Sequence, residues 1–138
     1  MGKIANDAIH AYMSEPTTMQ KLLSIVSDSH KKSLRIVFPP RVVSAHVDEL
    51  CGEMTLHFAS VEGRANTRWT HLEMDFTKTE FVDSLGINLI FDLVRFAEDR
   101  KASVVALLVN RAVRSTFYTV RLDKKMDIRL VEVHPQYS

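Results

Sequence analysis

Residues 103–109 (SVVALLV) form an almost continuous apolar run. Such a run is typical of a strand that is covered on both faces, as in a parallel sheet with helices packed against it. Helix-like patterns precede it, up to Ala97, and follow it, over 112–120. Because strands separated by helices imply parallel crossover connections, the run predicts an α/β domain.

The remaining apolar patterns extend this order on both sides. Residues 20–26 fit a strand or one helical turn, but the polar turn at 27–32 and the β-branched run that follows favour an antiparallel hairpin. The predicted strands are 21–26, 34–38, 72–76 (with one exposed face or edge), 103–109 and 127–133 (an edge strand). The predicted helices are 44–61, a second that begins within 81–86 and reaches Ala97, and 112–120. We therefore expect a mixed sheet, antiparallel at its start and parallel after it, with three to four helices.

Helical spacing also predicts which side chains face the core. Ser44 is placed to cap the first helix and Gly63 to follow its end. The expected inward residues are Val47, Leu50, Cys51, Met54 and Phe58 in the first helix, and Ile87, Ile90, Phe91, Val94 and Ala97 in the second.

The chain of 138 residues has the length of one domain, since domains commonly hold roughly 100–200 residues. Residues 1–19 are predicted to be a leader outside the fold, either a frayed tail or a helix docked on the domain, because Pro16 interrupts any helix there. Residues 20–138 are predicted to form the single domain.

Charge and composition narrow the possible partners and the compartment. Lys and Arg number 18 against 17 Asp and Glu, and this balance of +1 argues against a nucleic-acid-binding domain. The single cysteine, Cys51, forms no internal disulfide and fits a reducing compartment. No signal-peptide pattern is present, and no apolar stretch reaches the ~18 residues that span a bilayer. We expect a cytoplasmic protein without membrane insertion.

Metal, cofactor and catalytic motifs are absent from the sequence. The six histidines show no ligand spacing, and the four glycines form no nucleotide-binding motif, so no metal and no cofactor are expected. Ser84 and Gly86 match half of a hydrolase nucleophile elbow, but Val82 stands where that motif has a glycine. Cys51 is expected in the core rather than as a reactive thiolate. We therefore expect no enzyme.

What remains is Asp83-Ser84-Leu85-Gly86, at the predicted start of the second helix. One interpretation is a helix cap, in which Asp83 and Ser84 bind the first free N–H groups of the helix. The other is an exposed hydroxyl at a helix N-terminus, where the helix dipole tolerates a phosphate. Both interpretations stay open on the pattern alone.

Residues 75–86 (DFTKTEFVDSLG) resemble the core signature of STAS domains of the bacterial anti-sigma-factor antagonist type, in which a strand ends in Asp and a short loop leads to Asp-Ser and a helix. The resemblance continues through residues 102–114, and residues 119–128 (TVRLDKKMDI) are similar to the family's closing segment. It covers about residues 20 to 133 and is most specific over 75–128.

The resemblance implies a partner-switching regulator. In the family, the Ser after the Asp is phosphorylated by a partner kinase, often the anti-sigma factor itself, and a phosphatase restores it. Carried over, the phosphorylation site is Ser84. The implied partner-binding residues are Asp83, Ser84, Leu85, Gly86 and Ile87.

This sequence departs from the family pattern at three places. Leu85 replaces a second hydroxyl, Gly86-Ile87-Asn88 replaces Gly-Leu-Gly, and Val43 stands where the family has an acidic residue before the first helix. Leu85 would enlarge an apolar patch, which favours a protein partner over a soluble ligand. The alternative function is a STAS scaffold without phosphorylation, or an accessory subunit of a larger complex such as a transporter.

Overall fold

The sheet has five strands, in the order β1-β2-β4-β6-β7, in a computed structural model that describes residues 22–28, 30–62 and 69–132. The strands are β1 (Ser24–Asp28), β2 (Ser33–Val37), β4 (His71–Phe76), β6 (Ser103–Leu108) and β7 (Asp127–Leu130). β1 is antiparallel to β2, and every other neighbouring pair is parallel. The predicted α/β fold with an antiparallel start and a parallel remainder is confirmed.

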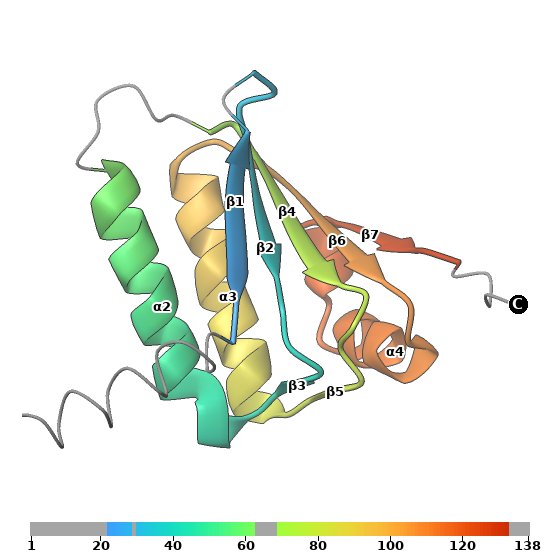
Figure 1. Cartoon of the computed structure of the whole chain (residues 1–138). Helices are drawn as coiled ribbons and strands as arrows, with labels where there is room; N and C mark the ends of the chain where they lie inside the picture. The colour runs from blue at the N-terminus through green and yellow to red at the C-terminus, as the bar shows by residue number, and fades with distance from the viewer. Residues whose placement is uncertain (1–21, 29, 63–68, 133–138) are drawn as a thin grey trace, which may run out of the picture.

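Three α-helices connect the described strands. They are α2 (Ser44–Glu62), α3 (Ser84–Asp99) and α4 (Arg111–Thr119), and a short 3₁₀-helix, η1 (Leu122–Lys124), follows α4. α2 and α3 lie next to each other on one side of the sheet, and α4 lies beyond the carboxyl end of β6 (Figure 1). The predicted leader, residues 1–19, and Gly63 lie outside the described residues.

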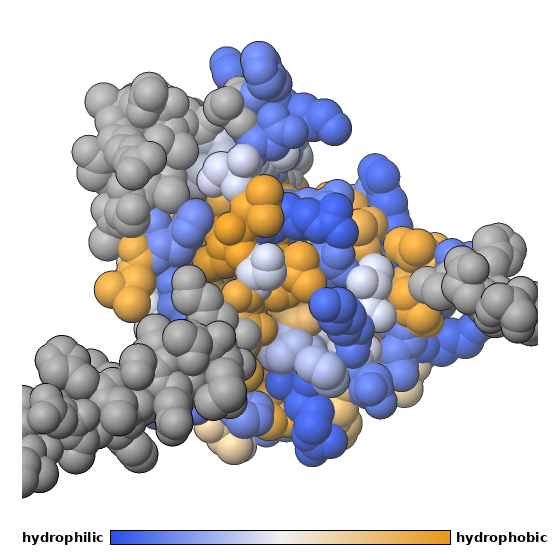
Figure 2. All heavy atoms as spheres, in the orientation of Figure 1, coloured by the Kyte–Doolittle hydropathy of each residue, from blue (hydrophilic) through white to orange (hydrophobic). Residues whose placement is uncertain are grey.

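The sheet has one covered and one open face. On β6, the buried side chains alternate with half-exposed ones, so that Val105 and Leu107 lie on the face away from α3. The prediction that residues 103–109 are covered on both faces is therefore wrong, because within the described residues only one face is packed under helices. Hydrophobic side chains gather over β1 and β2, with hydrophilic ones around them (Figure 2).

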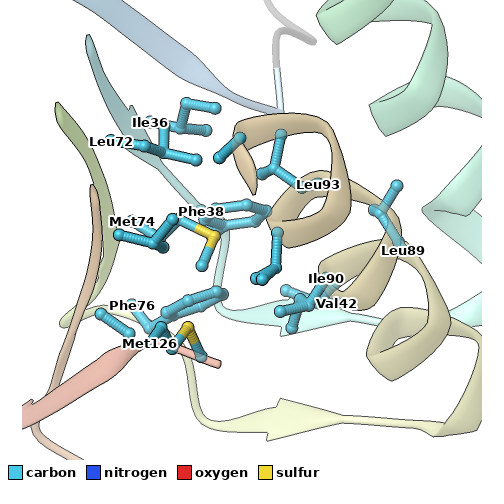
Figure 3. Packing of buried hydrophobic residues seen from close by; sticks show 14 of the residues in the cluster. Ile36, Phe38, Val42, Leu72, Met74, Phe76, Leu89, Ile90, Leu93 and Met126 are labelled. Atoms are coloured by element: carbon cyan, nitrogen blue, oxygen red, sulfur yellow. The ribbon is translucent and has the colours of Figure 1, made fainter. Parts of the chain in front are cut away.

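The core fills the space between the covered face and α3. Side chains from β2 and β4 face α3 across this space (Figure 3). The rings of Phe38 and Phe76 stack with centroids 4.4 Å apart, and Phe117 of α4 meets Phe76 edge-on at 5.2 Å. Each fully buried apolar side chain contributes about 1.5–3 kcal/mol. The fully buried residues on β2, β4, β6 and α3 include Leu34, Ile36, Leu72, Met74, Ile90, Ala106 and Leu108.

Among the predicted core positions, Cys51 is wrong, and Val47, Phe58 and Phe91 are only partly buried. Cys51 is exposed on α2, and desolvation together with the carboxylates of Asp48 and Asp92 raises the pKa of its thiol, so it is not a thiolate site. Phe91 is only partly buried, while Ile90 next to it is fully buried. The buried face of α3 is centred on Leu93 and Ile90 rather than on Phe91.

The first strand begins three residues later than the predicted 21–26. Leu22 and Leu23 donate their backbone N–H groups to the carboxylate of Glu53 on α2, at 3.0 and 2.9 Å, instead of pairing with β2. These two hydrogen bonds fix the chain against α2 before β1 starts. The ends of the other elements differ from the predictions by one to three residues: β2 is 33–37, β4 is 71–76 and central in the sheet, β6 is 103–108, α4 is 111–119, and β7 is 127–130.

Candidate functional site

A two-residue parallel pairing brings the starts of α2 and α3 together. β3 (Arg41–Val42) pairs with β5 (Phe81–Val82), with Val42 opposite Val82. Residues 81–82 were predicted to lie within the start of the second helix, but they form this strand and the helix begins at Ser84. Each helix starts two residues after its strand, at Ser44 and at Ser84, so the two helix N-termini lie next to each other at the lower edge of Figure 1.

The Asp83 carboxylate accepts hydrogen bonds from the first turns of both α2 and α3. One carboxylate oxygen, Oδ1, accepts a hydrogen bond from the backbone N–H of Gly86 at 2.9 Å, which caps α3. The other oxygen, Oδ2, accepts from the backbone N–H of Ser44 at 2.7 Å, at the start of α2. Ser44 is therefore the first residue of α2 rather than its cap, and the carboxylate that serves α2 comes from the neighbouring loop. Sequence reasoning missed this second bond.

These hydrogen bonds hold the pKa of the Asp83 carboxyl below its usual value. The bond from the Ser44 N–H has the largest effect, and the bond from Gly86 follows. Both donors are N–H groups of helix first turns, where the helix dipole also favours a negative charge. Asp83 is therefore ionised at neutral pH.

Gly86 allows the close approach of α3 to β3. A Cβ atom at this position would lie 2.1 Å from the carbonyl oxygen of Val42, which is far inside van der Waals contact. A glycine is therefore required here by packing. Gly86 and Ile87 are both buried at this start of α3, so the side chain of Ile87 points into the core rather than to the surface.

The exposed part of the site consists of Ser84, Leu85 and Phe81. The Ser84 side chain is exposed at the first position of α3, Leu85 is 48% exposed and Phe81 is 47% exposed. The guanidinium of Arg41 lies 5.0 Å from the centroid of the Phe81 ring. Two apolar side chains thus flank a free serine hydroxyl. The contribution of Phe81 and Arg41 was missed because their two-residue strands carry no periodic signal.

The strand-terminal Asp75 belongs to the scaffold behind this site. Its side chain is buried and forms an ion pair with Arg35, and its Oδ1 accepts hydrogen bonds from the Thr77 N–H at 2.8 Å and the Thr77 hydroxyl at 2.6 Å. Burial alone would raise the pKa of this carboxyl, but the bonds from Thr77 and Arg35 outweigh it and lower the pKa. Asp75 therefore fixes the turn that leads from β4 to β5.

Among residues 22–28, 30–62 and 69–132, no three His, Cys, Asp or Glu side chains are grouped as ligands for a metal ion. In the same part of the chain, no helix has both the length and the apolar character needed to cross a bilayer.

The order of strands and helices is that of a STAS-like fold. The solved structure of the anti-sigma factor antagonist SpoIIAA in its unphosphorylated form is similar with a TM-score of 0.56 and 13% identity, over 80% of this chain and 89% of that one. The Bacillus cell fate determinant SpoIIAA in its phosphorylated form is similar with a TM-score of 0.56 and 16% identity, over 78% of this chain and 90% of that one. No protein-family model and no curated protein matches the sequence. The expected STAS-like fold is confirmed.

Proposed function

We propose that this protein is a partner-switching regulator of the anti-sigma-factor antagonist type, which acts by binding and not by catalysis. It binds an anti-sigma factor that is also a serine kinase, and reversible phosphorylation of Ser84 controls the binding. The cytoplasm is the proposed compartment, and a serine phosphatase reverses the modification. The likeness to SpoIIAA in both an unphosphorylated and a phosphorylated form supports the proposal.

The observation that carries the proposal is that Asp83, and not Ser84, caps α3. Asp83 supplies the capping oxygen for α3, and the Ser84 hydroxyl is exposed beside it. A phosphate on Ser84 therefore replaces no hydrogen bond of the fold. It adds about −1.5 to −2 charges to the surface that carries Leu85 and Phe81.

The physical basis of switching is the desolvation of that charge. An unmodified surface with Leu85 and Phe81 suits an apolar protein interface. Burying an uncompensated phosphate in such an interface is costly, and the Asp83 carboxylate next to it adds repulsion. We propose that the exposed Ser84 and Leu85 and the half-buried Asp83 contact the partner, while Gly86 and Ile87 contribute by shaping the backbone.

The test compares Ser84→Ala, Ser84→Asp and wild type. The partner is first isolated from the source cells on immobilised wild-type protein, and its affinity for each purified variant is then measured by titration calorimetry. We expect Ser84→Ala to bind like wild type and Ser84→Asp to bind at least tenfold more weakly, a difference of about 1.4 kcal/mol. Ser115→Asp, an exposed position on α4, adds the same charge elsewhere and should leave the affinity unchanged.

The modification itself is tested by mass spectrometry after incubation of the isolated partner, ATP and wild-type protein. Phosphate on Ser84, absent from Ser84→Ala, is the expected result. If the two Ser84 variants bind like wild type and no phosphate is found on Ser84, the protein is the non-phosphorylated scaffold described above as the alternative.

A further inference from the structure

β1 is an edge strand without the usual protection against pairing. On one side it pairs with β2, and no other strand of the described residues pairs with its second side. Natural proteins protect edge strands with lysines, prolines, bulges or inward-pointing charges, because the free N–H and C=O groups pair readily with another strand. β1 (SIVSD) has no proline and no basic residue, and its one charge, Asp28, lies at its end.

The opposite edge of the same sheet is protected. β7 is four residues long, and its exposed Asp127 and Arg129 form an ion pair at 2.8 Å. Two charged side chains thus occupy half of that edge strand. The contrast between β1 and β7 singles out β1 as the edge that is open to pairing.

An exposed apolar side chain lies in the middle of β1. Val26 is 54% exposed and lies on the open face of the sheet, opposite Arg35 of β2. It lines a hollow of about 570 Å³ on this face, with Arg35, Glu73 and Val105 among the other lining residues. Apolar surface is concentrated over β1 and β2 in Figure 2.

We propose that β1 pairs antiparallel with β1 of a second copy of this chain, around a two-fold axis at Val26. This register pairs all five residues. It places Val26 opposite Val26 of the second copy and Ser24 opposite Asp28, where a hydroxyl can donate to a carboxylate, and it places no like charges opposite each other. Moving the axis by one residue, to Ser27, slips the register by two residues and would place Val26 opposite the Asp28 carboxylate.

The dimer forms one continuous sheet of ten strands, twice the five of each copy. The N-terminal end of β1 lies beside the carboxyl ends of β2 and β4, where the site around Ser84 is located. Because the copies run antiparallel, their two Ser84 sites lie at opposite ends of the joined sheet and both stay exposed. Pairing of two short strands buries little surface, so we expect a weak dimer in rapid exchange with the monomer.

Sedimentation velocity over a concentration series of the full chain tests the proposal. We expect wild type to shift from monomer toward dimer as its concentration rises to the order of 1 mM. Val26→Glu should stay monomeric without a loss of melting temperature, since the side chain is already exposed and the new carboxylate lies opposite Arg35 rather than a like charge. Leu56→Glu, which changes an exposed apolar residue on α2 in the same way, is the control and should dimerise like wild type. A wild-type chain that is monomeric throughout, or a Val26→Glu dimer as strong as wild type, overturns the proposal.

Cysteine cross-linking tests the register. In a chain carrying Cys51→Ser, Val26→Cys brings two thiols opposite each other across the axis, within the ~4.4–6.8 Å Cα separation of disulfides. Ser27→Cys, one residue away, lies opposite Ile25 of the second copy and on the other face of the sheet. Mild oxidation should cross-link Val26→Cys at least fivefold faster than Ser27→Cys. Equal rates, or faster cross-linking of Ser27→Cys, would contradict this register and the proposal with it.

Discussion

The backbone N–H of Ser44 donates a 2.7 Å hydrogen bond to the carboxylate of Asp83, 39 residues further along the chain. The same carboxylate caps α3 through Gly86. One side chain thus satisfies free N–H groups at the starts of two neighbouring helices. This relationship makes Asp83 the main polar link within the site, and Ser84 its free neighbour.

Replacing Asp83 should therefore destabilise the fold more than replacing Ser84. Asp83→Ala removes a capping oxygen, which costs about 0.5–2 kcal/mol, and it also removes the acceptor for Ser44. Ser84→Ala should change the free energy of unfolding by no more than about 0.5 kcal/mol, as for most exposed positions. Urea unfolding measures both changes in unfolding free energy, and the comparison is valid when the variants and wild type share the same m value, the dependence of that free energy on urea concentration. An equal loss in the two variants would mean that the Ser84 hydroxyl, and not Asp83 alone, caps α3.

The contribution of Asp83 should depend on pH in a defined direction. Its pKa in the folded protein is below the ordinary value of 3.8, so its stabilising effect is fully present above that value. The effect is lost as the pH falls through the lowered folded pKa. Wild type and Asp83→Asn should therefore differ most in unfolding free energy near neutral pH and converge below about pH 4. Other carboxylates titrate in both proteins, so only the difference reports on Asp83. A difference that is constant from pH 7 to pH 3 would contradict the assignment.

The two glycines of the helices should respond to alanine in opposite directions. Gly86→Ala places a Cβ atom 2.1 Å from the Val42 carbonyl oxygen and should destabilise by about 1–3 kcal/mol, the usual cost of overpacking. Gly52→Ala on α2 is the matched control, because nothing lies within 4 Å of its new Cβ atom. There alanine should stabilise by roughly 0.5–1 kcal/mol through its higher helix propensity. Thermal unfolding of the two variants measures the contrast, and a stabilising Gly86→Ala would refute the close approach.

Alanine substitutions of Ile90 and Phe91, which are adjacent on α3, should differ in how much they destabilise the fold. Ile90 is fully buried, so Ile90→Ala should cost about 2–5 kcal/mol. Phe91 is only partly buried, and Phe91→Ala should cost less in spite of the larger side chain removed. Chemical denaturation of both variants gives the order, and a greater loss at Phe91 would mean that the helix is rotated relative to the described core.

The parts of the fold that the sequence predicted are those with a strong local pattern. The apolar run at 103–109 and the helical spacing of Ile87, Ile90 and Val94 led to the strand and the helix that are observed. The same run did not show which of its faces is covered. That depends on α2 and α3 both lying on one side of the sheet, and no local pattern in the strand encodes this arrangement.

The candidate site was predicted in part. The Asp83–Gly86 segment was located because its cap-like residues begin a periodic helix. The pairing of β3 with β5 was missed, since two residues are too few for alternation to be visible. The Ser44–Asp83 and Arg35–Asp75 contacts were missed as well, because each joins residues about 40 positions apart.

The pairing of β3 with β5 restricts how the two loops can change in length. In each loop a single residue separates the paired valine from the first residue of the helix: Val43 lies between Val42 and Ser44, and Asp83 lies between Val82 and Ser84. Inserting one residue after Val42 alone would move the Ser44 N–H away from the Asp83 carboxylate and break the hydrogen bond between them. Insertions are therefore expected only where they leave both intervals intact, and the spacing Val-x-Ser at both helix starts, 42–44 and 82–84, can be used to identify sequences that keep the doubly capped arrangement.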